Sequence, residues 1–258
     1  MSMPRFFMEG AIPETGEFVL PINEKELRHM QVRRIEPKEH VACCAEGGNC
    51  WEVEIVSLDS EKAVGKNVGV LPIEKLPNLT LIQGISKGDR MGQVIRQTTE
   101  LGIQRIIPFM AKRTIVRFKT DERAFKAERW RRIALSAAKQ SGRCILPIVD
   151  NPTDIEDVCK DLKDFDRIVI AWEKADVNAE GKPLSIGDAL EGCDFSSKVA
   201  LIIGPEGGLA EEEVTRLQEI GDTVRAVSLG KLILRTETAG TVATALCMYH
   251  LGSLGNNK

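Results

Sequence analysis

Two glycine-bearing turns lie near the C-terminus, and each separates a short apolar segment from a segment with helical character. The first turn is residues 203–208 (IGPEGG), which follows the apolar run 199–203. The second is residues 228–240 (SLGKLILRTETAG). Ligands bind beyond the carboxyl ends of strands in an α/β sheet. The sequence therefore predicts a ligand site built from both turns.

The residues of the first turn indicate what kind of ligand it binds. Gly207 and Gly208 can adopt positive φ and let another molecule approach the backbone closely. Residues 211–213 are three glutamates, which the dipole of the following helix favours but which would repel a phosphate. The P-loop and Gly-x-Gly-x-x-Gly patterns are both absent from the sequence. We predict a neutral or zwitterionic ligand held by backbone groups, although an ordinary strand-to-helix turn would show the same pattern.

The second turn places charged residues at the start of a helix expected over 236–251. Residues 231–234 are mostly apolar, as suits a loop that covers a flat ring. Arg235 and Glu237 follow, either as a structural ion pair or as groups that face a substrate. Gly240 costs about 1 kcal/mol relative to alanine inside a helix, which suggests close approach by a backbone or a ligand. The apolar content of this helix predicts burial in a core or a subunit interface.

Four segments together resemble one family. Residues 201–214 (LIIGPEGGLAEEEV) and 227–243 (VSLGKLILRTETAGTVA) resemble the SPOUT-class RNA methyltransferases, and within that class the ribosomal small-subunit methyltransferase E family. Residues 86–116 and 137–147 (AAKQSGRCILP) are similar to two further blocks of that family. The chain departs from the family pattern at Lys139, where an acid is usual, and at Gln97, where a lysine is usual.

The resemblance implies a fold, a cofactor and an activity. The fold class it implies is α/β, with a C-terminal trefoil-knotted parallel sheet flanked by helices and a small N-terminal PUA-like β-barrel. It also implies S-adenosylmethionine as cofactor, a homodimer, and methylation of N3 of a uridine in 16S ribosomal RNA, as the free RNA or in the small subunit. We predict that the cofactor contacts both turns and the end of one more strand, at Ala171, Trp172, Glu173, Gly204, Pro205, Glu206, Gly207, Gly208, Leu229, Gly230, Ile233, Leu234 and Arg235.

Methylation at N3 requires a uracil ring to lose a proton. A cationic arginine near O2 or O4 would stabilise the resulting anion. The candidates are Arg113, Arg143 and Arg235, and we favour Arg235 because it adjoins the second turn. Glu237 or Glu206 could accept the proton, and the sequence does not choose between them.

Two other functions remain open at this stage. One is a methyltransferase of the same class acting on another RNA or on a ribose 2′-hydroxyl. The other is a non-catalytic RNA-binding or ribosome-assembly factor. The glycines of both turns favour an enzyme, because a protein that never bound the cofactor would have no need of all of them.

The charge distribution supports an RNA partner. The chain has 258 residues and a net charge of −3, but residues 86–143 alone carry +10, against −4 for residues 1–85 and −9 for residues 144–258. A local basic stretch is typical of an RNA-facing surface. Basic side chains on solvent-exposed helix faces, paired with acidic residues elsewhere in the chain, would give the same pattern.

Length and pattern predict two domains. Residues 1–75 contain short alternating segments such as 51–56 and are expected to form the RNA-binding β-barrel. Residues 76–258 alternate strands with helices, which predicts a parallel sheet covered on both faces and carrying cofactor binding, catalysis and dimerisation.

Cysteine usage and hydropathy predict a cytoplasmic protein without metal or membrane. The three histidines are scattered, and the cysteines show no Cys-x-x-Cys pair and no zinc-ligand spacing. No apolar run approaches the ~18 residues of a membrane-spanning helix, and residues 1–10 lack a secretory signal. We expect reduced thiols at all seven cysteines: Cys43, Cys44, Cys50, Cys144, Cys159, Cys193 and Cys247.

Overall fold

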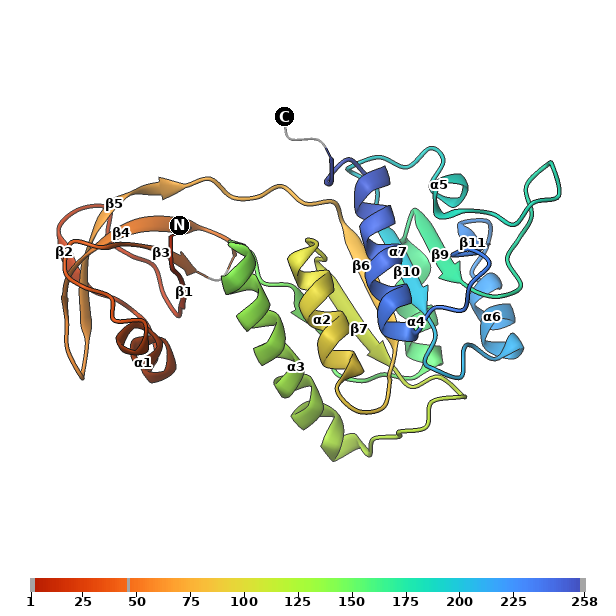
Figure 1. Ribbon diagram of the computed structural model, residues 1–258, viewed down its shortest axis with the longest axis horizontal. Coiled ribbons are helices and arrows are strands. Elements are labelled where there is room, and N and C mark those ends of the chain that lie inside the picture. The colour runs from red at the N-terminus through yellow and green to blue at the C-terminus, as the bar shows by residue number, and fades with distance from the viewer. Residues whose placement is uncertain (1–2, 46, 256–258) are drawn as a thin grey trace. The chain divides into compact units, whose positions relative to one another are not determined.

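The computed structural model describes residues 3–45 and 47–255 and divides the chain into two compact units (Figure 1). The first comprises Met1–Lys75 together with Ala138–Leu146, and the second comprises Leu76–Ala137 together with Pro147–Lys258. The chain therefore enters the second unit, returns to the first for nine residues and leaves it again. The pattern of the sequence places that short return segment in the second domain instead.

The first unit is a five-stranded mixed sheet with one helix. Its strands run in the order β1-β3-β4-β5-β2, with β1 parallel to β3 and the other neighbours antiparallel. The side chains of Phe6, Met30, Val41 and Ile55 are fully buried in its core. The elements are β1 (Arg5–Met8), β2 (Glu17–Val19), α1 (Glu24–Val32), β3 (His40–Ala45), β4 (Cys50–Leu58) and β5 (Ala63–Leu71).

The second unit is built on a six-stranded sheet in which every neighbouring pair is parallel, as the alternation of strands and helices predicts. The order is β11-β9-β10-β6-β7-β8. Neighbours in the sheet can be far apart in sequence: β6 pairs with β10 although β7, β8 and β9 lie between them along the chain. The strands are β6 (Leu79–Gly84), β7 (Arg105–Phe109), β8 (Ile148–Val149), β9 (Arg167–Ala171), β10 (Val199–Ile203) and β11 (Val224–Val227).

Helices cover both faces of this sheet, because successive side chains of each strand point to opposite sides. In β10, Val199, Leu201 and Ile203 join one apolar cluster, whereas Ala200 and Ile202 join the other. The first cluster includes residues of α2, α3, α5 and α7, and the second includes residues of α4, η1 and α6. The helices are α2 (Arg90–Glu100), α3 (Thr120–Ser141), α4 (Ile155–Asp161), η1 (Leu162–Asp164), α5 (Ile186–Ala189), α6 (Glu211–Gln218) and α7 (Thr236–His250).

The expectation of reduced thiols is wrong at two cysteines. Cys44 and Cys50 face each other across the β3–β4 pair, with 4.0 Å between their Cα atoms, and form a disulfide. Residues directly opposite in an antiparallel pair have their Cβ atoms close enough for a disulfide to join the two sulfur atoms. The sequence shows only that the two cysteines are six residues apart, not that they lie opposite each other. Within residues 3–45 and 47–255, no helix is both long and apolar enough to span a membrane.

Candidate active site

A cavity of about 880 Å³ opens in the second unit where β9, β10 and β11 end. Both glycine turns line it, although α6 and β11 separate them in sequence. Its volume falls within the roughly 300–1,000 Å³ that is typical of small-molecule sites. The lining residues are Arg90, Ala171, Trp172, Glu173, Ile203, Gly204, Pro205, Glu206, Gly207, Gly208, Leu209, Ser228, Leu229, Gly230, Lys231, Leu232, Ile233, Leu234, Arg235, Thr236, Glu237 and Ala239.

The first turn is packed so closely that glycine is required at several positions. A Cβ added to Gly204 would lie 3.0 Å from the backbone of Gly208, and one added to Gly84 would lie 2.4 Å from the nitrogen of Pro205. Gly208 has φ +69° and its N–H donates to the Pro205 carbonyl over 2.9 Å. The turn is therefore folded on itself and pressed against the end of β6.

The second turn is open and apolar. Gly230 has φ +116°, and its N–H donates to the Ser228 hydroxyl over 3.1 Å. Leu232 is 82% exposed and Ile233 is fully exposed. These apolar side chains border the cavity while exposed, and their role in covering a ligand ring stays a prediction.

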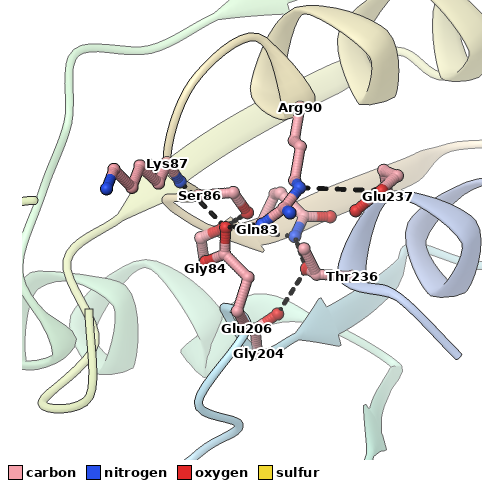
Figure 2. Close-up of polar contacts among 9 residues, drawn as sticks. All are labelled: Gln83, Gly84, Ser86, Lys87, Arg90, Gly204, Glu206, Thr236 and Glu237. Carbon is pink, nitrogen blue, oxygen red and sulfur yellow. Dashed lines mark hydrogen bonds and ion pairs between the residues drawn. The ribbon is translucent and has the colours of Figure 1, made fainter. Parts of the chain in front are cut away.

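A buried polar network joins the end of β6, the first turn and the start of α7 (Figure 2), and its members Gly204 and Thr236 line the cavity. Gln83, at the end of β6, is fully buried, and its Nε2 donates to the Thr236 hydroxyl over 2.9 Å. That hydroxyl in turn donates to the Gly204 carbonyl over 2.7 Å. Thr236 thereby ties the start of α7 both to the end of β6 and to the first turn, which fixes the second turn relative to the first.

Gly240 is explained by the same network. A Cβ at Gly240 would lie 2.7 Å from Oε1 of Gln83, so any larger residue there would displace the glutamine. The sequence predicted close approach at this glycine by a backbone or a ligand, whereas the neighbour is a side chain.

Charged groups from α2, the first turn and α7 meet at the edge of the cavity. Arg90 extends from the start of α2, with Nη1 2.5 Å from Oε1 of Glu206 and Nε 3.7 Å from Oε1 of Glu237 (Figure 2). The Lys87 N–H also donates to Oε1 of Glu206 over 3.0 Å. Burial raises the pKa of Glu206, but its backbone hydrogen bonds and Arg90 outweigh that effect and lower the pKa overall. Glu206 therefore stays ionised.

The three candidate arginines occupy different surroundings. Arg235 is exposed, occupies the N-cap position of α7 without a capping hydrogen bond from its side chain, and lines the cavity. Arg113 lies behind the first turn and donates from Nη1 to the Gly207 carbonyl over 3.2 Å. Arg143 lies in the first unit, where it is buried with Nε 3.9 Å from Oε1 of Glu74. Burial lowers the pKa of Arg143 to about 10, against the opposing effect of Glu74.

Residues 171–173 border the cavity at the end of β9. The backbone N–H of Trp172 donates to the Val227 carbonyl over 3.0 Å, which continues the pairing of β9 with β11. The indole Nε1 of Trp172 is buried and has no hydrogen-bond partner among the described residues. Glu173 is exposed.

Both positions that depart from the family pattern have partners within their own unit. Lys139 forms a mostly buried ion pair with Glu26 of α1. Gln97 accepts a hydrogen bond over 2.7 Å from the hydroxyl of Thr241, which joins α2 to α7.

Sequence reasoning missed Gln83, Arg90 and Thr236 as parts of the site. Gln83 is a polar residue in an apolar strand, and Arg90 begins the helix that follows that strand, so both lie at the carboxyl end of β6. That position was the available signal. The carboxyl end of β6 reaches the site only because β6 pairs with β10, and that pairing is visible only in the order of strands in the sheet.

With this geometry described, comparisons with known proteins define the class. A family model described as an RNA methyltransferase domain matches residues 74–248, which covers most of the second unit. The chain is an RNA methyltransferase family member, with the α/β fold expected from the resemblance.

More specifically, the chain belongs to the ribosomal RNA small subunit methyltransferase E family. The Bacillus subtilis protein of that name is 32% identical over 256 residues, which cover 96% of each chain. The Aquifex aeolicus protein is 29% identical over 236 residues, covering 89% of this chain and 94% of its own. The crystal structure of the Neisseria gonorrhoeae protein, bound to S-adenosylmethionine, superposes with a TM-score of 0.81 at 29% identity, covering 96% of this chain and 98% of its own.

Proposed function

We propose that this protein transfers a methyl group from S-adenosylmethionine to N3 of a uridine in 16S ribosomal RNA. The observation that carries the proposal is the meeting of the two glycine turns in one cavity. The names of the relatives support a small-subunit ribosomal RNA as substrate. Attack at N3 of a uridine rests on the family resemblance and on the charged groups at the cavity edge.

The cavity suits a nucleoside that carries a sulfonium group. Its walls combine the backbone of two turns with apolar side chains, including Leu229 and Leu234. Three acids (Glu173, Glu206 and Glu237) and three cations (Arg90, Lys231 and Arg235) line the cavity, a balance that suits a ligand carrying charges of both signs, as S-adenosylmethionine does. When bound, S-adenosylmethionine supplies the methyl group, which is released as its carbon–sulfur bond breaks.

Arg235 is placed to stabilise the uracil anion. It is the exposed arginine that lines the cavity beside the second turn, and it follows Leu234 directly. A guanidinium donates two parallel hydrogen bonds in a fixed geometry, which suits an oxygen that gains negative charge as N3 is deprotonated. In this proposal Arg113 supports the first turn from behind, and Arg143 takes no part in proton transfer.

Glu237 is the better of the two candidate proton acceptors. Glu206 already receives hydrogen bonds at Oε1 from the Lys87 N–H and from Arg90, and its lowered pKa makes it a weak base. Oε2 of Glu237 is buried and has no hydrogen-bond partner among the described residues, so it lacks the donors that make Glu206 a weak base. Arg90 holds the opposite oxygen of Glu237.

The proposal extends to the partners and the domains. The first unit is the RNA-binding PUA-like domain, and the basic helix α3 contributes exposed Arg129 and Arg132 to RNA contact. The protein is a homodimer that uses the exposed face of α7, where Val242, Leu246 and Tyr249 recur at helical spacing. Sedimentation at several protein concentrations tests the dimer.

The activity is tested with tritium-labelled S-adenosylmethionine and small subunits or 16S RNA from cells that lack the gene. Nucleoside analysis of the product should show label in 3-methyluridine. Label in a 2′-O-methylated nucleoside would refute the N3 assignment and retain the enzyme class. Calorimetry that detects no binding of S-adenosylmethionine at millimolar concentration would support a non-catalytic RNA-binding factor instead.

A further inference from the structure

Three cysteines that are distant in sequence meet within the first unit. Cys44 and Cys50 come from β3 and β4, and Cys144 comes from the return segment Ala138–Leu146. All three are buried, and their sulfur atoms lie within 4.8 Å of one another. Phe7 and Leu71 pack against them, so the cluster is enclosed by apolar groups.

Cys144 is positioned by hydrogen bonds and side-chain packing that do not involve the disulfide. Both carboxylate oxygens of Glu74 accept the Cys144 N–H, over 2.8 and 2.9 Å, and Oε1 also accepts the Ile145 N–H over 3.0 Å. The Ile145 side chain lies against the β3–β4 turn, where a Cβ on Gly48 would be 2.7 Å from it. Cys144 is therefore fixed beside the hairpin.

We propose that reduction of the Cys44–Cys50 disulfide converts these three cysteines into a binding site for a thiophilic d¹⁰ cation such as Zn²⁺. Thiolates select soft and borderline metal ions. With Zn–S bonds of about 2.3 Å and tetrahedral angles, bound sulfurs lie roughly 3.8 Å apart, which is within the observed spread of the three atoms. The proposal does not depend on the methyltransferase activity.

A cation, Arg5, and a carboxylate, Glu74, both lie beside the cluster. Three thiolates and one divalent cation have a net charge of −1, which requires a positive neighbour in a buried place. The Arg5 guanidinium lies beside Cys144 and supplies that charge, while the Glu74 carboxylate is held by the N–H groups of Cys144 and Ile145. Nε and Nη1 of Arg5 are buried without a hydrogen-bond partner among the described residues. A metal–thiolate centre would supply acceptors for these donors.

The chemistry balances with one added reductant. A dithiol gives two electrons and two protons to the Cys44–Cys50 disulfide and becomes a cyclic disulfide itself. The two thiols released, together with the free thiol of Cys144, then bind the cation and give up three protons, so that binding becomes tighter as the pH rises.

The test is a titration with Cd²⁺, whose thiolate complexes absorb in the ultraviolet. The full-length protein is reduced with dithiothreitol, the reductant is removed without oxygen, and free thiols are counted. We expect one Cd²⁺ per chain, the thiolate-to-metal band, and no such binding by the oxidised protein. The oxidised protein serves as a control that requires no substitution.

Two variants localise the site. Cys144→Ser should lower the Cd²⁺ affinity at least tenfold, because one of three ligands is lost. Cys43→Ser is the matched control, since Cys43 adjoins Cys44 in β3 but packs in the opposite core and should leave Cd²⁺ binding unchanged. A disulfide that resists dithiothreitol in the folded protein, or three free thiols that bind no Cd²⁺, would overturn the proposal.

Discussion

Arg235 can be removed without opening the core, because its side chain is exposed at the start of α7. We predict that Arg235→Ala lowers kcat by about 10²–10³, the loss seen when one group that stabilises an oxyanion is removed. The melting temperature should change little, since exposed substitutions usually alter stability by no more than about 0.5 kcal/mol. Arg235→Lys keeps the cation and should retain more of the rate. A normal kcat in Arg235→Ala would exclude the proposed role, and an unfolded variant would make the residue structural.

Gly207 tests whether the first turn forms the cofactor site. A Cβ at this position would lie 3.0 Å from Cβ of Arg113 and 3.2 Å from its carbonyl oxygen, so a branched side chain must push the turn towards the cavity. We predict that Gly207→Val abolishes binding of S-adenosylmethionine in calorimetry.

The control for Gly207 is Gly69→Ala in β5 of the first unit, where an added Cβ meets nothing within 4 Å. This variant should bind the cofactor as the wild type does. Unchanged affinity in Gly207→Val would show that the cofactor does not depend on this turn.

At the scale of elements, β6 organises the site although it contributes little to the cavity wall. Its last residues, Gln83 and Gly84, contact the start of α7 and the first turn. The parallel pairing of β6 with β10 brings Gly84 level with the turn that follows Ile203. The hydrogen bond from Gln83 to Thr236 then fixes where α7 begins. Cofactor binding should therefore depend on the hydrogen bond between buried Gln83 and Thr236, which lines the cavity.

Thr236 is the residue on which this dependence can be measured. Thr236→Val keeps the volume but removes the hydroxyl, so Gln83 keeps only its hydrogen bond to the Gly84 carbonyl and the Gly204 carbonyl loses its donor. We predict a loss of about 1–3 kcal/mol in the free energy of unfolding, as is typical of buried polar groups left unsatisfied. We also predict at least tenfold weaker cofactor binding, measured by denaturation and calorimetry.

Thr236→Ser supplies the matched control, because it restores both hydrogen bonds and should recover most of the cofactor affinity. If Thr236→Val lost stability but bound S-adenosylmethionine normally, the network would be structural only. Equal cofactor affinity in the valine and serine variants would likewise show that the hydroxyl does not support binding.

Elements with strong periodicity were predictable from the sequence, and the contacts between them were not. The predicted bounds of helix α7 and strand β10 agree with the structure to within a residue, because apolar pattern and glycine punctuation mark them. Strand β3 was missed because Cys43 and Cys44 interrupt any alternation. The placement of Gln83 against Thr236, and of Cys144 against the β3–β4 hairpin, depends on segments far apart in sequence, about which local pattern carries no information.

At the scale of the whole molecule, each unit buries a thiol in its own apolar core: Cys43 in the first and Cys247 in the second. Burial, with a smaller effect of Glu26, raises the pKa of Cys43 to about 12. Burial, with a smaller effect of Cys193, raises the pKa of Cys247 to about 12. The reference pKa of both thiols is 9.0, so above that pH the unfolded chain loses these protons while the folded units keep them. Stability must therefore fall as the pH rises from 9 towards 12, by roughly 1 kcal/mol per pH unit for each thiol.

This pH dependence can show whether the two units unfold independently. Urea denaturation is followed by tryptophan fluorescence in two variants. When Trp130 and Trp172 are replaced by phenylalanine, the fluorescence of Trp51 reports on the first unit. When Trp51 is replaced instead, the fluorescence of Trp130 and Trp172 reports on the second unit. We predict that Cys43→Ala flattens the alkaline slope of the free energy of unfolding only in the first reporter, and Cys247→Ala only in the second. Each core supplies its own buried thiol, so each unit should carry its own pH dependence. If one substitution flattened both slopes, the two units would unfold as a single cooperative body. If the free energy of unfolding of the wild type did not fall above pH 9, the raised pKa of both thiols would be refuted.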